Sequence, residues 1–236
     1  MGVKKGWFQK KISEYSKFRG YQKPETHKGV LKLDSNENLA ISKQFQSEII
    51  DIAKTKSDVR EYPLGKTEEL LRALSKYLAV PISMIGVGNG SDQILDLILS
   101  NFATLQTRIL TSNPTFGFFE ERCKLYSIPT IKIPFSENMT LELEEIFLKL
   151  KKADILYLDS PNNPTGFQFQ KRELEKLIKS FDGLVIIDEA YGEFSDFSVA
   201  KMVQKQDNLI VVRTFSKAFG LAGLRLGYFV ANKIFV

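Results

Sequence analysis

The sequence contains few of the residues that define several common kinds of functional site. Its 236 residues include one cysteine, Cys123, and one histidine, His27. A single cysteine excludes an internal disulfide, and a single histidine gives no basis for a histidine-based catalytic triad or a zinc site. We interpret Cys123 as a buried thiol within a predicted helix and His27 as a surface residue. The chemistry of this protein must therefore come from other side chains.

Long apolar runs and strong charge patterning are also absent. No run approaches the roughly 20 apolar residues of a membrane span, and no apolar segment of a secretory signal follows the N-terminal lysines. We therefore expect a cytoplasmic protein without membrane contact. The net charge of +5 is not gathered into a basic stripe interleaved with aromatics, so we expect no nucleic acid partner. An anionic cofactor and substrate explain a mild positive excess equally well.

From Thr67 onward, short apolar segments alternate with segments of helical spacing. The predicted strands cover residues 84–88, 107–111, 128–133, 155–158, 184–187, 209–212 and 226–230. The predicted helices cover residues 67–78, 91–101, 116–126, 141–150 and 171–179. Most of the strands are apolar on both faces, which is typical of a parallel sheet covered by helices. This alternation predicts a doubly wound α/β domain.

The first forty residues have a different character. Residues 7–18 predict a short amphipathic helix with a basic face, and residues 20–40 predict an irregular arm rich in proline, glycine, asparagine and charge. Residues 42–54 return to helical spacing. We therefore divide the chain into an N-terminal helix and arm, residues 1–40, and one large domain, residues 41–236.

Polar residues follow five of the predicted strands, at the ends where these strands finish. They occupy residues 90–92, 113–116, 159–166, 188–191 and 214–217. Ligands of open α/β sheets bind at the carboxyl ends of the strands. Five chemically rich loops at one edge therefore predict a binding site there.

Lys217, Asp188 and Tyr191 suggest which ligand this site takes. A lysine that forms a Schiff base, an acid at the end of a buried strand and a nearby phenol are what pyridoxal phosphate requires. Taken singly, Lys217 reads as a surface charge, and Asp188 and Ser216 read as helix caps. Residues 86–90 alone read as a tight turn, because they lack the spacing of a dinucleotide loop. The combination of these residues in one order favours the cofactor site.

Six stretches of the chain carry a family resemblance. They are Glu61-Tyr-Pro63, Gly88-Asn-Gly-Ser-Asp92, Asn113-Pro-Thr-Phe116, Ser160-Pro-Asn-Asn-Pro-Thr-Gly166, Asp188-Glu-Ala-Tyr191 and the run from Arg213 to Tyr228. With these stretches the chain resembles the fold-type I pyridoxal-phosphate enzymes and, among them, the histidinol-phosphate aminotransferases. The resemblance implies a three-layer α/β/α large domain with a mostly parallel sheet. It also implies pyridoxal 5'-phosphate as cofactor and amino transfer from histidinol phosphate to 2-oxoglutarate in histidine biosynthesis.

The resemblance implies a role for each candidate residue. Lys217 would hold the cofactor as a Schiff base and later move a proton, Asp188 would pair with the pyridine nitrogen, and Tyr191 would hydrogen-bond the ring oxygen. The other implied cofactor contacts are Asn163 at the ring oxygen, Phe116 stacked on the ring, and Gly90, Ser91, Asp92, Thr214, Ser216 and Arg225 around the phosphate. Tyr62 would reach across a homodimer to the phosphate of the second subunit, and Asn36 would lie over the substrate.

The chain departs from the family pattern in three places. Phe116 stands where many relatives have tyrosine, and Leu39 stands where relatives often have proline. The chain also stops at Val236, before the small C-terminal domain whose arginine is expected to bind the substrate carboxylate. We therefore expect a piece of a longer enzyme, with no carboxylate-binding arginine assigned. Transfer on another amino acid such as an aromatic one, a lyase like the threonine-phosphate decarboxylases, and a cofactor-binding fragment without turnover remain alternatives.

Overall fold

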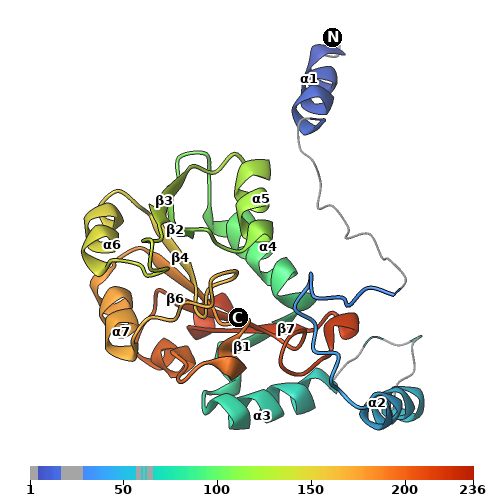
Figure 1. Ribbon diagram of the computed structural model, residues 1–236. Helices are drawn as coiled ribbons and strands as arrows, with labels where there is room; N and C mark the ends of the chain where they lie inside the picture. The colour runs from blue at the N-terminus through green and yellow to red at the C-terminus, as the bar shows by residue number, and fades with distance from the viewer. Residues whose placement is uncertain (1–4, 17–28, 57–59, 61, 63–65) are drawn as a thin grey trace.

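The computed structural model describes residues 5–16, 29–56, 60, 62 and 66–236. Within them a seven-stranded sheet runs in the order β1-β7-β6-β5-β4-β2-β3 (Figure 1). The strands are β1 (Ile85–Gly88), β2 (Ile109–Asn113), β3 (Thr130–Pro134), β4 (Ile155–Asp159), β5 (Leu184–Asp188), β6 (Leu209–Thr214) and β7 (Gly227–Ala231). Strand β7 pairs antiparallel with β1 and β6, and the other neighbouring pairs are parallel. The prediction of a mostly parallel sheet is confirmed.

Helices cover both faces of this sheet. They are α3 (Lys66–Leu78), α4 (Gly90–Phe102), α5 (Gly117–Leu125), α6 (Leu143–Leu150) and α7 (Lys171–Ser180). One core cluster joins α3, α6 and α7 to the sheet, through side chains such as Leu74, Ile146 and Leu177. A second cluster joins α4 and α5, through Leu95 and Phe119. The three-layer α/β/α arrangement is therefore confirmed.

The strands read as apolar throughout because both of their faces are buried. In β5, Val185 and Ile187 belong to the first cluster and Ile186 belongs to the second. Successive side chains of a strand point to opposite faces, so each alternate residue enters a different core. Burial of each such side chain contributes about 1.5–3 kcal/mol, and the two cores together fix the register of the central strands.

The strands extend further toward their carboxyl ends than the apolar pattern predicts. Strand β2 ends at Asn113, which pairs with Pro134, and β6 ends at Thr214, which pairs with Gly227. The predicted strands stop two residues earlier because the last strand positions are polar: Asn113 is exposed, Arg213 forms a buried ion pair with Glu189, and Thr214 lines the pocket described below. Their backbone groups nevertheless continue the sheet ladder, so the polar residues that follow the apolar runs are held on rigid strand ends.

The N-terminal part divides into two helices and an arm. Helix α1 (Lys5–Tyr15) lies apart from the sheet, and α2 (Lys43–Lys56) lies closer to it (Figure 1). Between them the arm lies against the loop after β6, where Asn38 Nδ2 donates to the Ala218 carbonyl at 2.9 Å. Gly220 has φ +65°, and a Cβ there would lie 2.2 Å from Ile41 Cγ1. The loop thus needs glycine at this position for the arm to approach.

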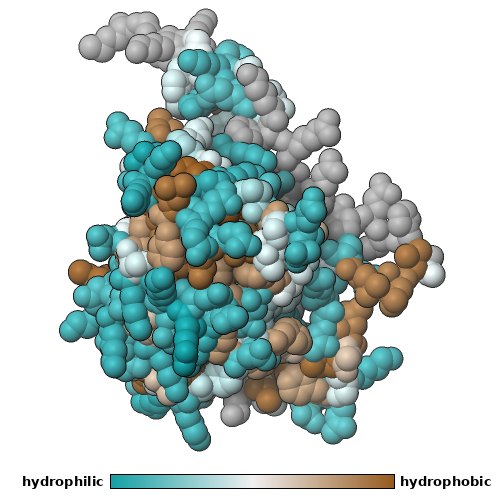
Figure 2. Space-filling view, turned by 60° about the vertical axis from the view of Figure 1, so that its left-hand side comes forward, coloured by the Kyte–Doolittle hydropathy of each residue, from teal (hydrophilic) through white to brown (hydrophobic). Residues whose placement is uncertain are grey.

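The surface is consistent with helices that bury one face. Figure 2 shows a face made mostly of hydrophilic side chains, with apolar side chains gathered in separate patches. In the part of the chain that the structure describes, no helix is both long and apolar enough to cross a bilayer. His27 lies outside the described residues, and Cys123 is buried, as predicted.

Candidate active site

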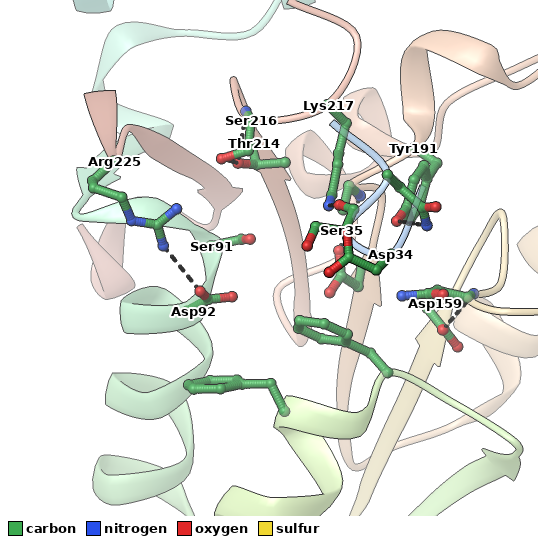
Figure 3. Close-up of a pocket in the computed structure, with 16 residues that line it drawn as sticks. Asp34, Ser35, Ser91, Asp92, Asp159, Tyr191, Thr214, Ser216, Lys217 and Arg225 are labelled. Atoms are coloured by element: carbon green, nitrogen blue, oxygen red, sulfur yellow. Dashed lines mark hydrogen bonds and ion pairs between the residues drawn. The ribbon is translucent and has the colours of Figure 1, made fainter. Parts of the chain in front are cut away.

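A pocket of about 410 Å³ opens at the carboxyl ends of β4, β5 and β6, beside the N-terminus of α4. Its size falls in the range of small-ligand sites. The predicted residues that line it are Asn36, Ser91, Asp92, Phe116, Asn163, Asp188, Tyr191, Thr214, Ser216, Lys217 and Arg225. Figure 3 shows Arg225 and Asp92 toward one end, Tyr191 and Asp159 toward the other, and Lys217 between them. Residues from six distant stretches of sequence therefore meet in one pocket.

The first end of the pocket is built at the start of α4. Gly90 has φ +78°, and a Cβ at Gly227 would lie 2.5 Å from the Ser91 nitrogen, so two glycines allow β7 to approach this turn. The side chain of Asn89 makes no capping hydrogen bond, and Gln93 Oε1 accepts from the Asn89 N–H at 2.7 Å, which leaves the N–H groups of Ser91 and Asp92 without a capping side chain among the described residues. The first N–H groups of α4 therefore remain available to an anion, and the helix dipole favours one there.

Side chains add further donors at this end. Arg225 has a left-handed backbone, with φ +51°, and its Nη2 lies 3.0 Å from Asp92 Oδ2. Thr214 and Ser216 are buried and hydrogen-bonded to each other, with 3.0 Å between their hydroxyl oxygens. A guanidinium, two hydroxyl groups and a helix N-terminus make a suitable cradle for a phosphate. Such a ligand would share Arg225 with Asp92.

Lys217 lies over the middle of the pocket. Its Nζ donates to the Ser35 carbonyl at 2.7 Å, and lies 5.7 Å from the centre of the Tyr191 ring. Burial lowers the pKa of this lysine, while the carboxylates of Asp92, Glu37 and Asp188 act in the opposite direction. A lowered pKa increases the fraction of neutral amine, which is the form that attacks a carbonyl carbon.

Asp188 is a buried carboxylate at the end of β5. It accepts hydrogen bonds from Tyr157 Oη at 3.0 Å and from the Ala190 N–H at 2.9 Å. It forms no ion pair with a lysine or arginine of the described residues, and its pKa is raised to about 7 by burial and then by the charge of Asp159. A buried carboxylate is costly without a cation. This position therefore suits a ligand that brings a positive charge, such as a protonated ring nitrogen.

Two further groups face the pocket beside Asp188. Tyr191 Oη accepts a hydrogen bond from Asn36 Nδ2 at 2.9 Å, which joins the arm to the loop after β5. The side chain of Asn163 lines the same region, and its backbone N–H donates to Asp159 Oδ2 at 2.8 Å. Burial raises the pKa of the Tyr191 phenol, so it stays a hydrogen-bond donor at neutral pH.

Aromatic side chains form one wall. Phe116 directly precedes α5 and lines the pocket together with Phe118, with 5.9 Å between the ring centres and 32° between their planes. Phe119, on the next position, instead stacks on Tyr157 inside the core, with centroids 3.5 Å apart. The pocket thus has a flat apolar surface on which an aromatic ligand can lie.

Five lining residues were not predicted as site residues: Asp34, Ser35, Phe118, Asp159 and Ala190. Asp159 carried the clearest signal in the sequence, because it directly follows the apolar run 155–158 as Asp188 follows the apolar run 184–187. Ser35 acts through its backbone carbonyl, for which side-chain identity gives no signal. Conversely, Tyr62 lies outside this pocket within the described structure and is 89% exposed. The described residues contain no cluster of histidine, cysteine, aspartate or glutamate suited to a metal ion.

The structure thus places a half-buried lysine, Lys217, and a buried aspartate, Asp188, in one pocket at the carboxyl edge of a mostly parallel sheet. The family model described as aminotransferase class I and II matches residues 28–236. The chain therefore belongs to the class I and II aminotransferase family, which is a family of enzymes.

Individual relatives refine this likeness. The histidinol-phosphate aminotransferase of Pyrococcus furiosus is 38% identical over 202 residues, which cover 85% of this chain and 59% of the relative. The crystal structure of the histidinol-phosphate aminotransferase from Clostridium acetobutylicum is 28% identical with a TM-score of 0.73, over 84% of this chain and 59% of that one. The L-threonine-O-3-phosphate decarboxylase from Porphyromonas gingivalis is 27% identical with a TM-score of 0.69, over 82% and 60%. The chain thus spans about 59% of the length of the curated relative.

Proposed function

We propose that this chain binds pyridoxal 5'-phosphate covalently through Lys217 and takes part in amino transfer. The observation that carries the proposal is the placement of Lys217, whose pKa is lowered, above the buried Asp188, which lacks a cationic partner among the described residues. When bound, pyridoxal phosphate supplies an electron-withdrawing ring that stabilises negative charge on the substrate's α-carbon. The residues present therefore fit both ends of this cofactor.

Each group around the pocket has a distinct task in this proposal. Asp188 holds a proton on the ring nitrogen, and Tyr191 and Asn163 donate hydrogen bonds to the ring oxygen. Phe116 would offer its flat face to the ring. The phosphate-binding groups are the turn at Gly90, the N–H groups of Ser91 and Asp92, the hydroxyls of Thr214 and Ser216, and the guanidinium of Arg225.

Lys217 has a second task after the substrate amine displaces it. Its freed Nζ would accept the proton from the substrate's α-carbon and would return it at the neighbouring cofactor carbon. Asn36 lies on the arm above Tyr191, where it limits the space left for the substrate. Lys217 Nζ, now donating to the Ser35 carbonyl, is the atom that would hold the cofactor.

We propose histidinol phosphate as amino donor and 2-oxoglutarate as acceptor. The names and identities of the relatives support this choice over other amino acids, including aromatic ones. A decarboxylase acting on a phosphorylated amino acid is the second candidate, because the decarboxylase neighbour is 27% identical, close to the 28% of the aminotransferase. Both substrates carry a phosphate, and the two reactions differ in the bond of the α-carbon that is broken.

We also propose that the active unit is a homodimer in which Tyr62 serves the second subunit. Its 89% exposure and its position outside the pocket of its own chain support this role. Chains carrying Lys217→Ala can be mixed with chains carrying Tyr62→Ala. One intact site per mixed dimer should restore part of the activity, whereas no recovery would count against the assignment of Tyr62.

The absorbance of the cofactor tests the reaction. The purified chain is mixed with pyridoxal phosphate, and histidinol phosphate, phenylalanine and threonine phosphate are then added in separate samples. Loss of the bound-aldehyde band with histidinol phosphate, together with a keto product, is expected. Carbon dioxide release from threonine phosphate would favour the decarboxylase. A covalent cofactor that responds to none of the three would contradict the transfer reaction for this chain, and Lys201→Ala, an exposed lysine, provides the matched control.

A further inference from the structure

Asp159 is a second buried carboxylate in the pocket, and the proposed function gives it no task. It ends β4 and stands directly opposite Asp188 in the parallel register of β4 and β5. Register partners on neighbouring strands point to the same face, about 5 Å apart. Both side chains line the pocket, and both residues are at most 5% exposed. Two carboxylates so close in a buried site require an explanation.

The hydrogen bonds around Asp159 favour its ionised form. Thr115 Oγ1 donates to Oδ1 at 3.0 Å, Asn162 Nδ2 donates to the same oxygen at 2.8 Å, and the Asn163 N–H donates to Oδ2 at 2.8 Å. Ser112 Oγ adds a longer contact of 3.5 Å to Oδ1. Donors that converge on a carboxylate stabilise its charge. Asp159 thereby also fixes the backbone of Asn163, which the proposed function places at the ring oxygen.

Asp188 has a smaller set of donors, Tyr157 and the Ala190 N–H. Besides Asp159, the charged or titratable groups that act on it are Asp92 from α4, Tyr191 from the loop after β5 and Lys217 from the loop after β6. When two neighbouring carboxyl groups have unequal surroundings, their pKa values are pushed apart. Burial raises the pKa of Asp159 as well, but the hydrogen bonds from Asn163, Asn162 and Thr115 oppose that rise. Asp188 has fewer donors, and its pKa is raised to about 7. The negative charge is therefore better stabilised on Asp159.

We propose that Asp159 is a positioning residue that strengthens the hold of Asp188 on a protonated pyridine nitrogen. Its fixed negative charge makes Asp188 a more basic partner, and it adds a second attraction for the positive ring. The hydrogen bond that it accepts from the Asn163 N–H fixes the position of the loop after β4, which carries Asn163 to the ring oxygen. This inference rests on the proposed function, and it adds a residue on which the protonation of the cofactor depends.

The test compares two ligands that differ in one atom. One is pyridoxal phosphate, and the other is an analogue in which carbon replaces the ring nitrogen while the aldehyde, phenol and phosphate are kept. Dissociation constants of both are measured at pH 7.5 for the unchanged chain, for Asp159→Asn and for Asp154→Asn. Asp154 precedes β4 at its opposite end and is half-exposed, so its variant removes an equal charge from the far edge.

Asp159→Asn should weaken pyridoxal phosphate about tenfold, as expected for a change of roughly one pKa unit in its partner. The same variant should weaken binding of the analogue by no more than about twofold, since that ligand has no ring proton. Asp154→Asn should weaken the binding of neither ligand. Equal weakening of both ligands would overturn the proposal and leave Asp159 a structural residue only. No weakening of either ligand would overturn it as well.

The amide introduced by Asp159→Asn cannot accept from every donor that the Asp159 carboxylate binds, so a second variant guards against loss of the fold. Thr115→Val removes one donor and leaves the charge in place, and it should produce the same selective effect at about two- to threefold. Equal weakening of the two ligands by Thr115→Val would also oppose the proposal. If the unchanged chain itself fails to bind pyridoxal phosphate, the proposed function fails, whereas binding without selectivity between the ligands refutes the role of Asp159 alone.

Discussion

The buried ion pair between Glu189 and Arg213 should dominate the stability of the loop that carries Asp188 and Tyr191. Glu189 follows β5, Arg213 lies in β6, and their side chains are 3% and 5% exposed. Glu189 Oε2 accepts from Arg213 Nε at 2.9 Å, and Glu189 Oε1 accepts from the Val199 N–H at 2.7 Å. This one carboxylate joins two neighbouring strands and the loop beyond them.

The variant Glu189→Gln keeps the shape of the side chain and removes its charge. An amide has one acceptor oxygen, so either the Val199 N–H or the Arg213 guanidinium loses its partner. Glu193 remains 2.9 Å from Arg213 Nη1 and compensates for part of the loss. Removal of one member of a buried ion pair costs about 3–5 kcal/mol. For a chain of this size each kcal/mol lowers Tm by about 2–4 °C, so a decrease of about 6–20 °C is expected.

Thermal and urea unfolding of the cofactor-free chain measure this effect. Glu68→Gln is the matched control, because Glu68 pairs with Arg72 on the exposed surface of α3 and should cost about 0.5 kcal/mol or less. The double variant Glu189→Gln with Arg213→Met should be less destabilised than the sum of the two single variants. A loss below about 1 kcal/mol for Glu189→Gln would refute the reasoning, since the pair would then not restrain the loop.

Three further predictions concern the pocket itself. Because the pKa of Asp188 is raised from 3.8 to about 7, the folded chain keeps a proton that the unfolded chain loses, and stability should fall as pH rises through this window. Asp188→Asn should flatten that dependence in thermal melts of the cofactor-free chain, and an unchanged slope would contradict it. Gly227→Ala places a Cβ 2.5 Å from the Ser91 nitrogen, so titration should show pyridoxal phosphate bound at least about tenfold more weakly, with pyridoxal, which lacks the phosphate, less affected. Arg225→Lys keeps the charge but loses the planar fork, and it should likewise weaken pyridoxal phosphate selectively, by about three- to tenfold; equal losses for both ligands would argue against a phosphate at this end.

The sequence was sufficient to predict the layers of the fold and the edge of the sheet that carries the pocket. The central strands could be predicted from the sequence because both of their faces are apolar. In β5, for example, Ile186 and Ile187 enter different cores. The end of β6 was harder to predict, because Arg213 and Thr214 are polar residues that still pair with β7 in the sheet. A prediction based on the apolar pattern alone places the end of a strand at its last apolar residue.

The candidate residues were identified from the order of their motifs along the chain and from the family resemblance. The contacts among these residues were known only from the structure. The pairing of Asp159 with Asp188 depends on the register of two strands, which a linear pattern does not specify. The contact of Lys217 with the Ser35 carbonyl joins residues 182 positions apart through a backbone atom. Tyr157 fits a buried strand, yet its hydroxyl group binds Asp188. Such relations arise from tertiary packing.

The covalent attachment of the cofactor tests the central claim most directly. The chain is incubated with pyridoxal phosphate, reduced with borohydride, digested, and analysed by peptide mass spectrometry, alongside the Lys217→Ala and Lys201→Ala variants. We predict one dominant phosphopyridoxyl group, located on Lys217, retained in Lys201→Ala and lost in Lys217→Ala. A label spread over exposed lysines, or one that persists in Lys217→Ala, would contradict the assignment of this pocket as the cofactor site.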